Sequence, residues 1–130
     1  MPLEVFLVTP EREIWTGDAR LVVARGSEGG LGIMSGHAPL MVELGIGPLF
    51  INRDGERIAA AIDGGFLHVM SEGMDTRVDV LAEHAELEAD IDMDQARHMK
   101  EDAERRLRER DDADAAADLA KALARLNLGS

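Results

Sequence analysis

The 130-residue chain has no cysteine and few aromatic side chains. The lack of cysteine excludes disulfide bonds and thiolate metal sites, and it is consistent with a cytoplasmic protein. The aromatic residues are Phe6, Trp15, Phe50 and Phe66, so a core must be built mainly from Val, Ile, Leu, Ala and Met. Such a core is small and often leaves a chain dependent on a partner. We expect the seven methionines to fill gaps in this core rather than to form a binding surface.

Basic residues and long apolar runs are also scarce. Fourteen basic and 26 acidic residues give a formal net charge of −12, which disfavours binding to nucleic acid and to anionic lipid. No apolar run approaches the length that spans a bilayer, and the N-terminal residues lack the features of a signal peptide. We therefore expect no nucleic-acid partner and no direct insertion into lipid.

The first two thirds of the chain alternate short apolar stretches with turn residues. Residues 3–8, 20–24 and 77–81 have strand character, and Val78 and Val80 share one face of the last stretch. Asp54-Gly55 tolerates the positive φ angles of a tight hairpin turn. Twelve of the 13 glycines lie in this part of the chain. The pattern predicts an all-β sandwich over residues 1–87.

Residues 88–130 have a different pattern, with no proline and no glycine before Gly129. Asp90 or Asp92 can cap a helix. Apolar residues then recur at intervals of three and four in two stripes, the first formed by Met93, Ala96, Met99, Ala103 and Leu107, and the second by Ala116, Leu119, Ala120, Leu123 and Leu126. The interruption at residues 111–112 predicts an antiparallel helical hairpin. Because alanine buries little area, we expect this hairpin to be weakly held.

The sequence contains no evident catalytic or metal-binding constellation. The glycine-rich stretch 26–36 has neither the spacing of a dinucleotide fingerprint nor a Gly-Lys-Ser/Thr P-loop. The four histidines form no pair at helical spacing that suits a metal ion. A small hydrolase that uses His37 or His68 is an alternative without a supporting arrangement. We therefore predict no catalytic residue, no metal site and no enzymatic activity.

Four stretches of the chain resemble, in order, the epsilon subunit of bacterial F-type ATP synthases, whose mitochondrial equivalent is called delta. These stretches are LEVFLVTPER at residues 3–12, GSEGGLGIMSGHAPL at 26–40, IDGGFLHV at 62–69 and VDVLAEHAE at 78–86. The resemblance implies a non-catalytic central-stalk rotor subunit with a β-sandwich followed by a helical hairpin. It also implies a peripheral position on the cytoplasmic face of the bacterial plasma membrane, within the synthase. The alternative is a free-standing β-sandwich binding module with a helical tail.

The resemblance implies that the sandwich binds the gamma subunit and the c-ring and couples ring rotation to the catalytic head. It assigns Glu28, Gly30 and His37 to these contacts. Two positions depart from the family pattern, because Gly30 stands where many relatives carry glutamate and Ser35 where many carry proline. The ring contact is therefore expected to be less polar or differently arranged.

Basic residues crowd the end of the first predicted helix, where they complement the helix dipole or dock on an acidic partner. In the family, the hairpin extends toward the alpha and beta subunits of the head and inhibits ATP hydrolysis, with its basic residues meeting an acidic loop. The resemblance therefore assigns inhibitory docking to Arg105, Arg106 and Arg108.

Some relatives bind ATP in the folded hairpin. Of the residues that they use, the chain retains matches at Ile91, Asp92, Ala96, Lys121 and Arg125. Gln95 and Asp102, however, stand where those relatives carry arginine, and Asp102 would repel a phosphate. We therefore predict that ATP binding is weak or absent and that no cofactor is required.

Overall fold

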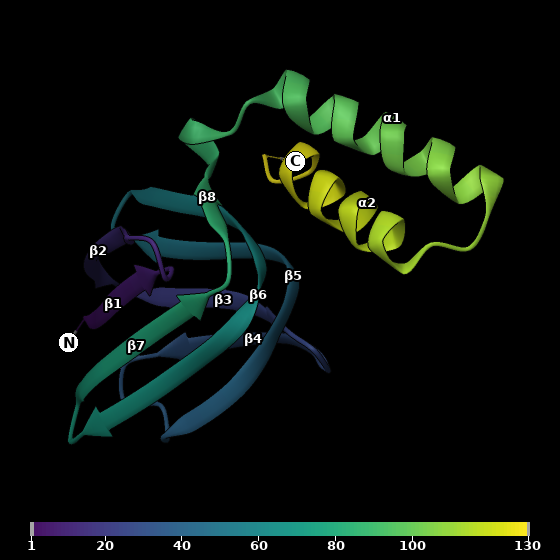
Figure 1. Cartoon of the computed structure of the whole chain (residues 1–130). Helices are drawn as coiled ribbons and strands as arrows, with labels where there is room; N and C mark the ends of the chain where they lie inside the picture. The colour runs from purple at the N-terminus through teal and green to yellow at the C-terminus, as the bar shows by residue number, and fades with distance from the viewer. Residues whose placement is uncertain (1, 130) are drawn as a thin grey trace.

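The structure is a computed structural model that describes residues 2–129, with a β-sandwich followed by two helices (Figure 1). The strands are β1 (Leu3–Val8), β2 (Glu13–Ala19), β3 (Leu21–Gly26), β4 (Gly29–Met34), β5 (Leu40–Arg53), β6 (Glu56–Glu72), β7 (Asp75–Ala82) and β8 (Ala85–Leu87). A short 3₁₀ turn, η1 (Glu88–Asp90), leads to α1 (Met93–Glu109) and α2 (Ala113–Leu126). The predicted fold class is confirmed.

The strands hydrogen-bond in the order β2-β1-β7-β6-β5-β3-β4, and β8 pairs with β6. Neighbours are antiparallel except β1 and β7, which run parallel. The long strand β6 changes partner along its length, because residues 60–62 pair with β8 and residues 65–72 pair with β7. This change of partner lets the strands wrap around a single core.

Gly64 and Gly65 make the change of partner possible. Both have positive φ, and a Cβ atom added to Gly65 would lie 2.2 Å from the carbonyl oxygen of Leu81. Only glycine tolerates this close approach of two backbones together with that φ angle.

The core is built from aliphatic side chains, as its scarcity of aromatic residues requires. Val78 and Val80 are fully buried on the inner face of β7, which confirms the predicted alternation. The expectation for the methionines is wrong for five of the seven, since these side chains are 40–63% exposed: Met34, Met41, Met70, Met74 and Met93. Leu, Ile, Val and Ala side chains fill the interior, and these five methionines lie at the surface.

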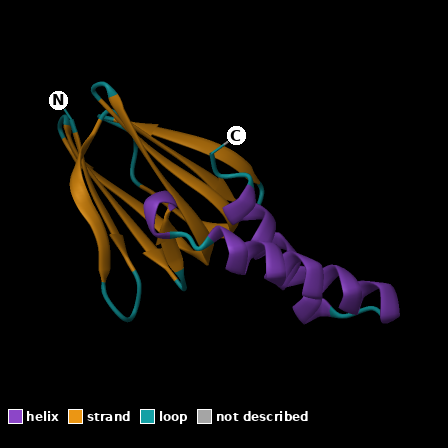
Figure 2. Cartoon of the chain, turned by 90° about the horizontal axis from the view of Figure 1, so that it is seen from above, coloured by secondary structure: helices purple, strands orange, loops and turns teal. Residues whose placement is uncertain are grey.

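The helical hairpin projects beyond the sandwich, with its connection farthest from the sheets (Figures 1 and 2). Asp92 caps α1 by accepting from the Gln95 amide at 3.1 Å, and Asp112 caps α2 by accepting from the Ala115 amide at 3.0 Å. Helix α2 packs on β5 and β6, whereas α1 packs on α2. Helix α2 therefore has two packed sides.

This double packing explains why the predicted apolar stripe of α2 is only partly correct. Ala116 is exposed, and Leu123 is 37% exposed. The buried residues of α2 are Ala115, Ala122 and Arg125. A single helical stripe cannot describe a helix that is covered by a sheet on one side and by another helix on the other.

Replacement of Gly65 by alanine is expected to lower the free energy of unfolding by about 2 kcal/mol or more, because the added Cβ collides with the β7 backbone at a strained φ. Urea unfolding followed by circular dichroism measures this loss. Gly45→Ala is the matched control, since no atom lies within 4 Å of its added Cβ and its φ is not positive. Equal midpoints for the two variants would contradict this account.

Candidate functional site

A buried ion pair joins the hairpin to the sandwich. Arg125 of α2 and Asp63 of β6 are 7% exposed each. Arg125 Nη1 donates to Asp63 Oδ1 at 2.9 Å, and Nη2 donates to Asp63 Oδ2 at 2.8 Å. Arg125 Nε also donates to Glu86 Oε1 at 2.6 Å. We call these three side chains the latch, because they are the charged link between α2 and the sheets.

The latch is electrostatically satisfied. Burial is the largest single influence on the pKa of Arg125 and lowers it, but the hydrogen bonds and charges of Asp63 and Glu86 together outweigh burial, so the pKa is raised above its usual value. Within residues 2–129, no buried side-chain nitrogen or oxygen lacks a hydrogen-bond partner. Arg125 therefore stays charged and paired with both carboxylates while the hairpin is docked.

A small apolar cluster adjoins the latch. Leu128 is 2% exposed and packs with Ala59 and Ala61 of β6, and Phe50 and Ile91 cover its margin. Two of its three buried members are alanines, so the apolar area buried here is modest. The docked position therefore depends strongly on the latch.

A second group of ion pairs holds the two helices to each other. Arg106 of α1 donates to Asp118 of α2 at 2.9 Å and to Asp102, one turn earlier on α1, at 2.7 Å. A third carboxylate, Asp112, lies 3.8 Å from Arg106. Hydrogen bonds to Asp118 and then to Asp102 raise the pKa of Arg106. We call this group the staple, because it spans the hairpin.

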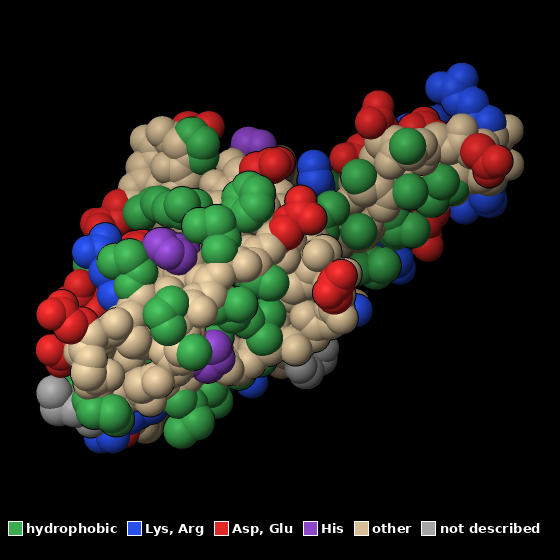
Figure 3. Space-filling view, turned by 90° about the horizontal axis from the view of Figure 1, so that it is seen from below, with side chains coloured by type: hydrophobic (Ala, Val, Ile, Leu, Met, Phe, Trp, Pro, Cys, Tyr) green, Lys and Arg blue, Asp and Glu red, His purple; other side chains and the backbone are tan. Residues whose placement is uncertain are grey.

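The three arginines assigned to inhibitory docking lie in different environments. Arg106 is half-buried in the staple, and Arg105 pairs with Asp102, whereas Arg108 is exposed. Figure 3 shows Lys and Arg side chains gathered at the far end of the hairpin. Arg106 could meet an acidic partner only after the staple breaks.

The residues that match the ATP motif are largely committed to structural contacts. Asp92 caps α1, Ala96 is buried, and Ile91 packs against the apolar cluster. The carbonyl of Lys121 accepts from Arg125 at 2.9 Å, and Arg125 belongs to the latch. Gln95 is exposed.

The residues assigned to gamma and ring contacts do not lie together. Glu28 is in the turn before β4 and Gly30 is in its first part, whereas His37 follows the other end of this six-residue strand. A strand of this length separates its ends by roughly 17 Å. Glu28 and His37 therefore belong to two separate loops.

The loop that contains His37 is pinned to the turn between β6 and β7. Buried Thr76 accepts from the Gly36 amide at 2.7 Å, and the Ser71 hydroxyl donates to the His37 carbonyl at 2.5 Å. Ser35 donates to the Met74 carbonyl at 2.9 Å. Ser35 thus contributes a contact that a proline at this position could not make.

The outer face of β5, β6 and β7 carries exposed apolar side chains. Phe66 lies opposite Leu81, and Met41 lies opposite His68. Met41, Phe66 and Leu81 are 60%, 48% and 46% exposed. In Figure 3, apolar side chains gather over the face of the sandwich that is seen from below. A patch of this kind is typical of a protein–protein contact.

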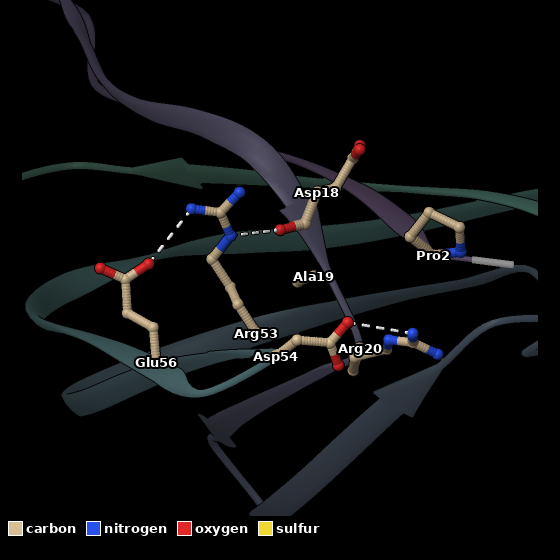
Figure 4. Close-up of a pocket in the computed structure, with 7 residues that line it drawn as sticks. All are labelled: Pro2, Asp18, Ala19, Arg20, Arg53, Asp54 and Glu56. Atoms are coloured by element: carbon tan, nitrogen blue, oxygen red, sulfur yellow. Dashed lines mark hydrogen bonds and ion pairs between the residues drawn. The ribbon is translucent and has the colours of Figure 1, made fainter.

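A polar cavity of about 400 Å³ lies beside the β5–β6 turn (Figure 4). Arg20 pairs with Asp54 at 3.0 Å, and Arg53 donates to the Asp18 carbonyl at 2.8 Å and to Glu56 at 3.2 Å. Both guanidinium groups already face carboxylates, so these contacts stabilise the turn and offer no free anion site.

Residues 2–129 contain no group of three or more His, Asp or Glu side chains arranged to hold a metal ion. The same residues form no helix that is long and apolar enough to cross a membrane.

A family model described as the β-sandwich domain of the ATP synthase delta/epsilon chain matches residues 2–88. The chain is 41% identical to the ATP synthase epsilon chain of Thermobifida fusca over 127 residues, which cover 95% of this chain and 89% of that one. It is also 41% identical to the ATP synthase epsilon chain of Brevibacillus brevis over 109 residues, covering 83% and 80%.

Two solved structures have a similar fold. A chain of the Euglena gracilis mitochondrial ATP synthase aligns with a TM-score of 0.82 and 22% identity, covering 98% of this chain and 81% of that one. A chain from the central stalk and c-ring structure of the Tetrahymena thermophila enzyme aligns with a TM-score of 0.54 and 22% identity, covering 75% and 71%.

A β-sandwich followed by a docked helical hairpin defines the chain as a two-part protein. The matches to the sandwich and to near full-length relatives make the assignment more specific. The chain belongs to the delta/epsilon family of ATP synthase chains.

The latch partners Asp63 and Glu86 were not identified from the sequence. The sequence offered one signal for Asp63, which directly follows the apolar run 58–62. A carboxylate inside a strand usually needs a buried partner. The partner, however, is 62 residues away.

The staple is expected to weaken in acid. Hydrogen bonds from Arg106 and then Arg105 hold the pKa of Asp102 below its ordinary value of 3.8. A depressed folded-state pKa stabilises the fold fully above pH 3.8, and this stabilisation is lost as the pH falls through the lower, folded-state pKa. Thermal unfolding of the wild type and Asp102→Asn should therefore differ near neutral pH and converge below pH 3.8. A difference that stays constant from neutral pH down to strong acid would exclude this role for Asp102.

Proposed function

We propose that the chain is a central-stalk rotor subunit of a proton-translocating F-type ATP synthase. Its sandwich binds the gamma subunit and the c-ring, and its hairpin inhibits ATP hydrolysis when it leaves the sandwich. The observation that carries the proposal is the way the hairpin is held, by one buried ion pair and a small alanine-rich cluster. Such a contact can define a docked state and can also be released.

The exposed sheet face supports the stalk role. Phe66, Leu81 and Met41 form an apolar patch on β5, β6 and β7, and they are not the residues of β5 and β6 that pack in the cluster with the hairpin, Phe50, Ala59 and Ala61. Gamma can therefore bind this patch whether the hairpin is docked or released. The pinned loop around His37 lies at the end of the same strands and is already ordered for a contact with a second partner.

The distal end of the hairpin supports the inhibitory role. Arg108 and Arg110 are exposed there, and Arg105 is paired only with a surface carboxylate. These cations can approach an acidic loop of the catalytic head at little desolvation cost. Arg106 joins them only if the helices separate.

We propose further that the chain binds ATP weakly or not at all and needs no cofactor. A cavity of about 370 Å³ opens beside the latch, and its walls include the carboxylates of Glu11, Asp63 and Glu86 and the guanidinium groups of Arg12 and Arg125. The carboxylates outnumber the guanidinium groups and Arg125 is already paired with two of them, so the cavity disfavours phosphate groups. Peripheral attachment to the membrane then follows from the synthase, through gamma and the ring.

The full chain is expected to lower ATP hydrolysis by a catalytic head that lacks this subunit about fivefold or more, a range typical of regulatory coupling. A truncated chain that ends at Asp90 should bind without this effect, because it lacks the hairpin. The measurement is steady-state hydrolysis with binding checked in parallel. If both chains bind and neither inhibits, the subunit couples rotation without inhibiting ATP hydrolysis. If neither binds, the proposed place in the stalk is wrong.

Phe66→Glu is expected to weaken binding to gamma about tenfold or more, because exposed aromatic side chains often dominate such interfaces. Titration of labelled gamma measures the affinity. Met93→Glu is the matched control, since Met93 is also exposed and lies on the hairpin. A larger loss for Met93→Glu would place the gamma contact on the hairpin instead.

A further inference from the structure

Every nitrogen of the Arg125 guanidinium donates a hydrogen bond. Nε binds Glu86, Nη2 binds Asp63, and Nη1 binds both Asp63 and the Lys121 carbonyl. Both Asp63 oxygens accept in a bidentate geometry, which is the strongest arrangement for this pair. Four of the five N–H donors of Arg125 are thus engaged within the chain while the hairpin is docked.

The local charge leads to the same conclusion. One guanidinium faces two carboxylates, so the latch carries a net negative charge. Without Asp63, the buried guanidinium of Arg125 would require an anion from solution as its counterion. Asp63 supplies this negative charge from the sheet itself. The position of Asp63 on β6, opposite the last turn of α2, also fixes the one register in which the helix can dock.

We propose that Asp63 is an internal counterion that latches the hairpin through Arg125, so that the docked state is set by this ion pair and requires no bound nucleotide. The proposal rests on the proposed regulatory role of the hairpin. The ion pair between Asp63 and Arg125 controls release of the hairpin. The two helices stay paired through the Arg106 staple when the latch opens.

The lack of cysteine allows a direct test, because an introduced thiol reacts alone. Ala61 is fully buried beneath the hairpin, whereas the neighbouring Ala60 is fully buried in the sandwich core. Ala103 is fully buried on α1, which packs on α2. Thiols introduced by Ala61→Cys, Ala60→Cys and Ala103→Cys therefore report undocking, unfolding of the sandwich and separation of the helices. Their rates of reaction with a disulfide reagent measure the three open populations in the full chain.

Arg125→Met in the Ala61→Cys background should raise the thiol reaction rate roughly a hundredfold or more, because removal of one partner leaves the other buried and unpaired. The rates in the Ala60→Cys and Ala103→Cys backgrounds should change little. Arg97→Met is the matched control, since Arg97 lies on the same hairpin and pairs with Asp94 at the surface. It should leave all three rates unchanged.

The double variant Asp63→Leu with Arg125→Met tests whether the two residues act as a pair. An apolar pair can replace a buried ion pair at little cost, so this variant should recover most of the protection that Arg125→Met loses. Millimolar Mg-ATP should not change the rate of Ala61→Cys when the latch is otherwise intact.

Two results would contradict the proposal that the pair of Asp63 and Arg125 sets the docked state. One is an unchanged Ala61→Cys reaction rate when Arg125 is replaced, and the other is clear slowing of that rate by Mg-ATP in the chain with an intact latch. Failure of the proposed function gives a different result, because Arg125→Met would then release the hairpin without changing hydrolysis by the catalytic head.

Discussion

The position of the hairpin depends on the buried pair between Asp63 and Arg125. The surrounding contacts of Ala59, Ala61 and Leu128 are small and nonspecific, and helices with alanine-rich faces can slide on such a surface. A bidentate ion pair between a strand and a helix tolerates no such sliding, because displacement by one residue would leave both charges buried and unpaired. The latch thus fixes the position of the hairpin on the sandwich, although the interface between them has little apolar area.

The strands could be predicted from the sequence because their signals are local. Alternation at Val78 and Val80 and the turn at Asp54-Gly55 each depend on a few neighbouring residues, and both features are present. The latch has no local signal, since its partners come from β6, β8 and α2. The candidate docking and ligand residues were assigned by resemblance, and only the structure shows that Arg106 and Arg125 are engaged in internal pairs.

The core of the sandwich and its surface near the loops differ in their apolar side chains. The interior is filled by Val, Leu, Ile and Ala, whereas Met34, Met41, Met70 and Met74 are exposed near the loops. Flexible, polarizable side chains suit surfaces that adapt to a partner. Thr76 and Ser71 at the same time hold the adjacent loop rigid, so an adaptable apolar surface surrounds a fixed polar anchor.

The latch is more buried than the staple, so the two groups of ion pairs respond differently to dissolved salt. The staple lies near the surface, so dissolved salt screens it, whereas the latch is shielded from solvent. Because α2 carries the latch and α1 reaches the sheets mainly through α2, opening of the latch frees both helices together. Separation of the helices is a further step that exposes Arg106. A hairpin built in this way can leave the sandwich as a paired unit, and it can then present Arg106 to a partner only where that partner supplies carboxylates to replace Asp102 and Asp118.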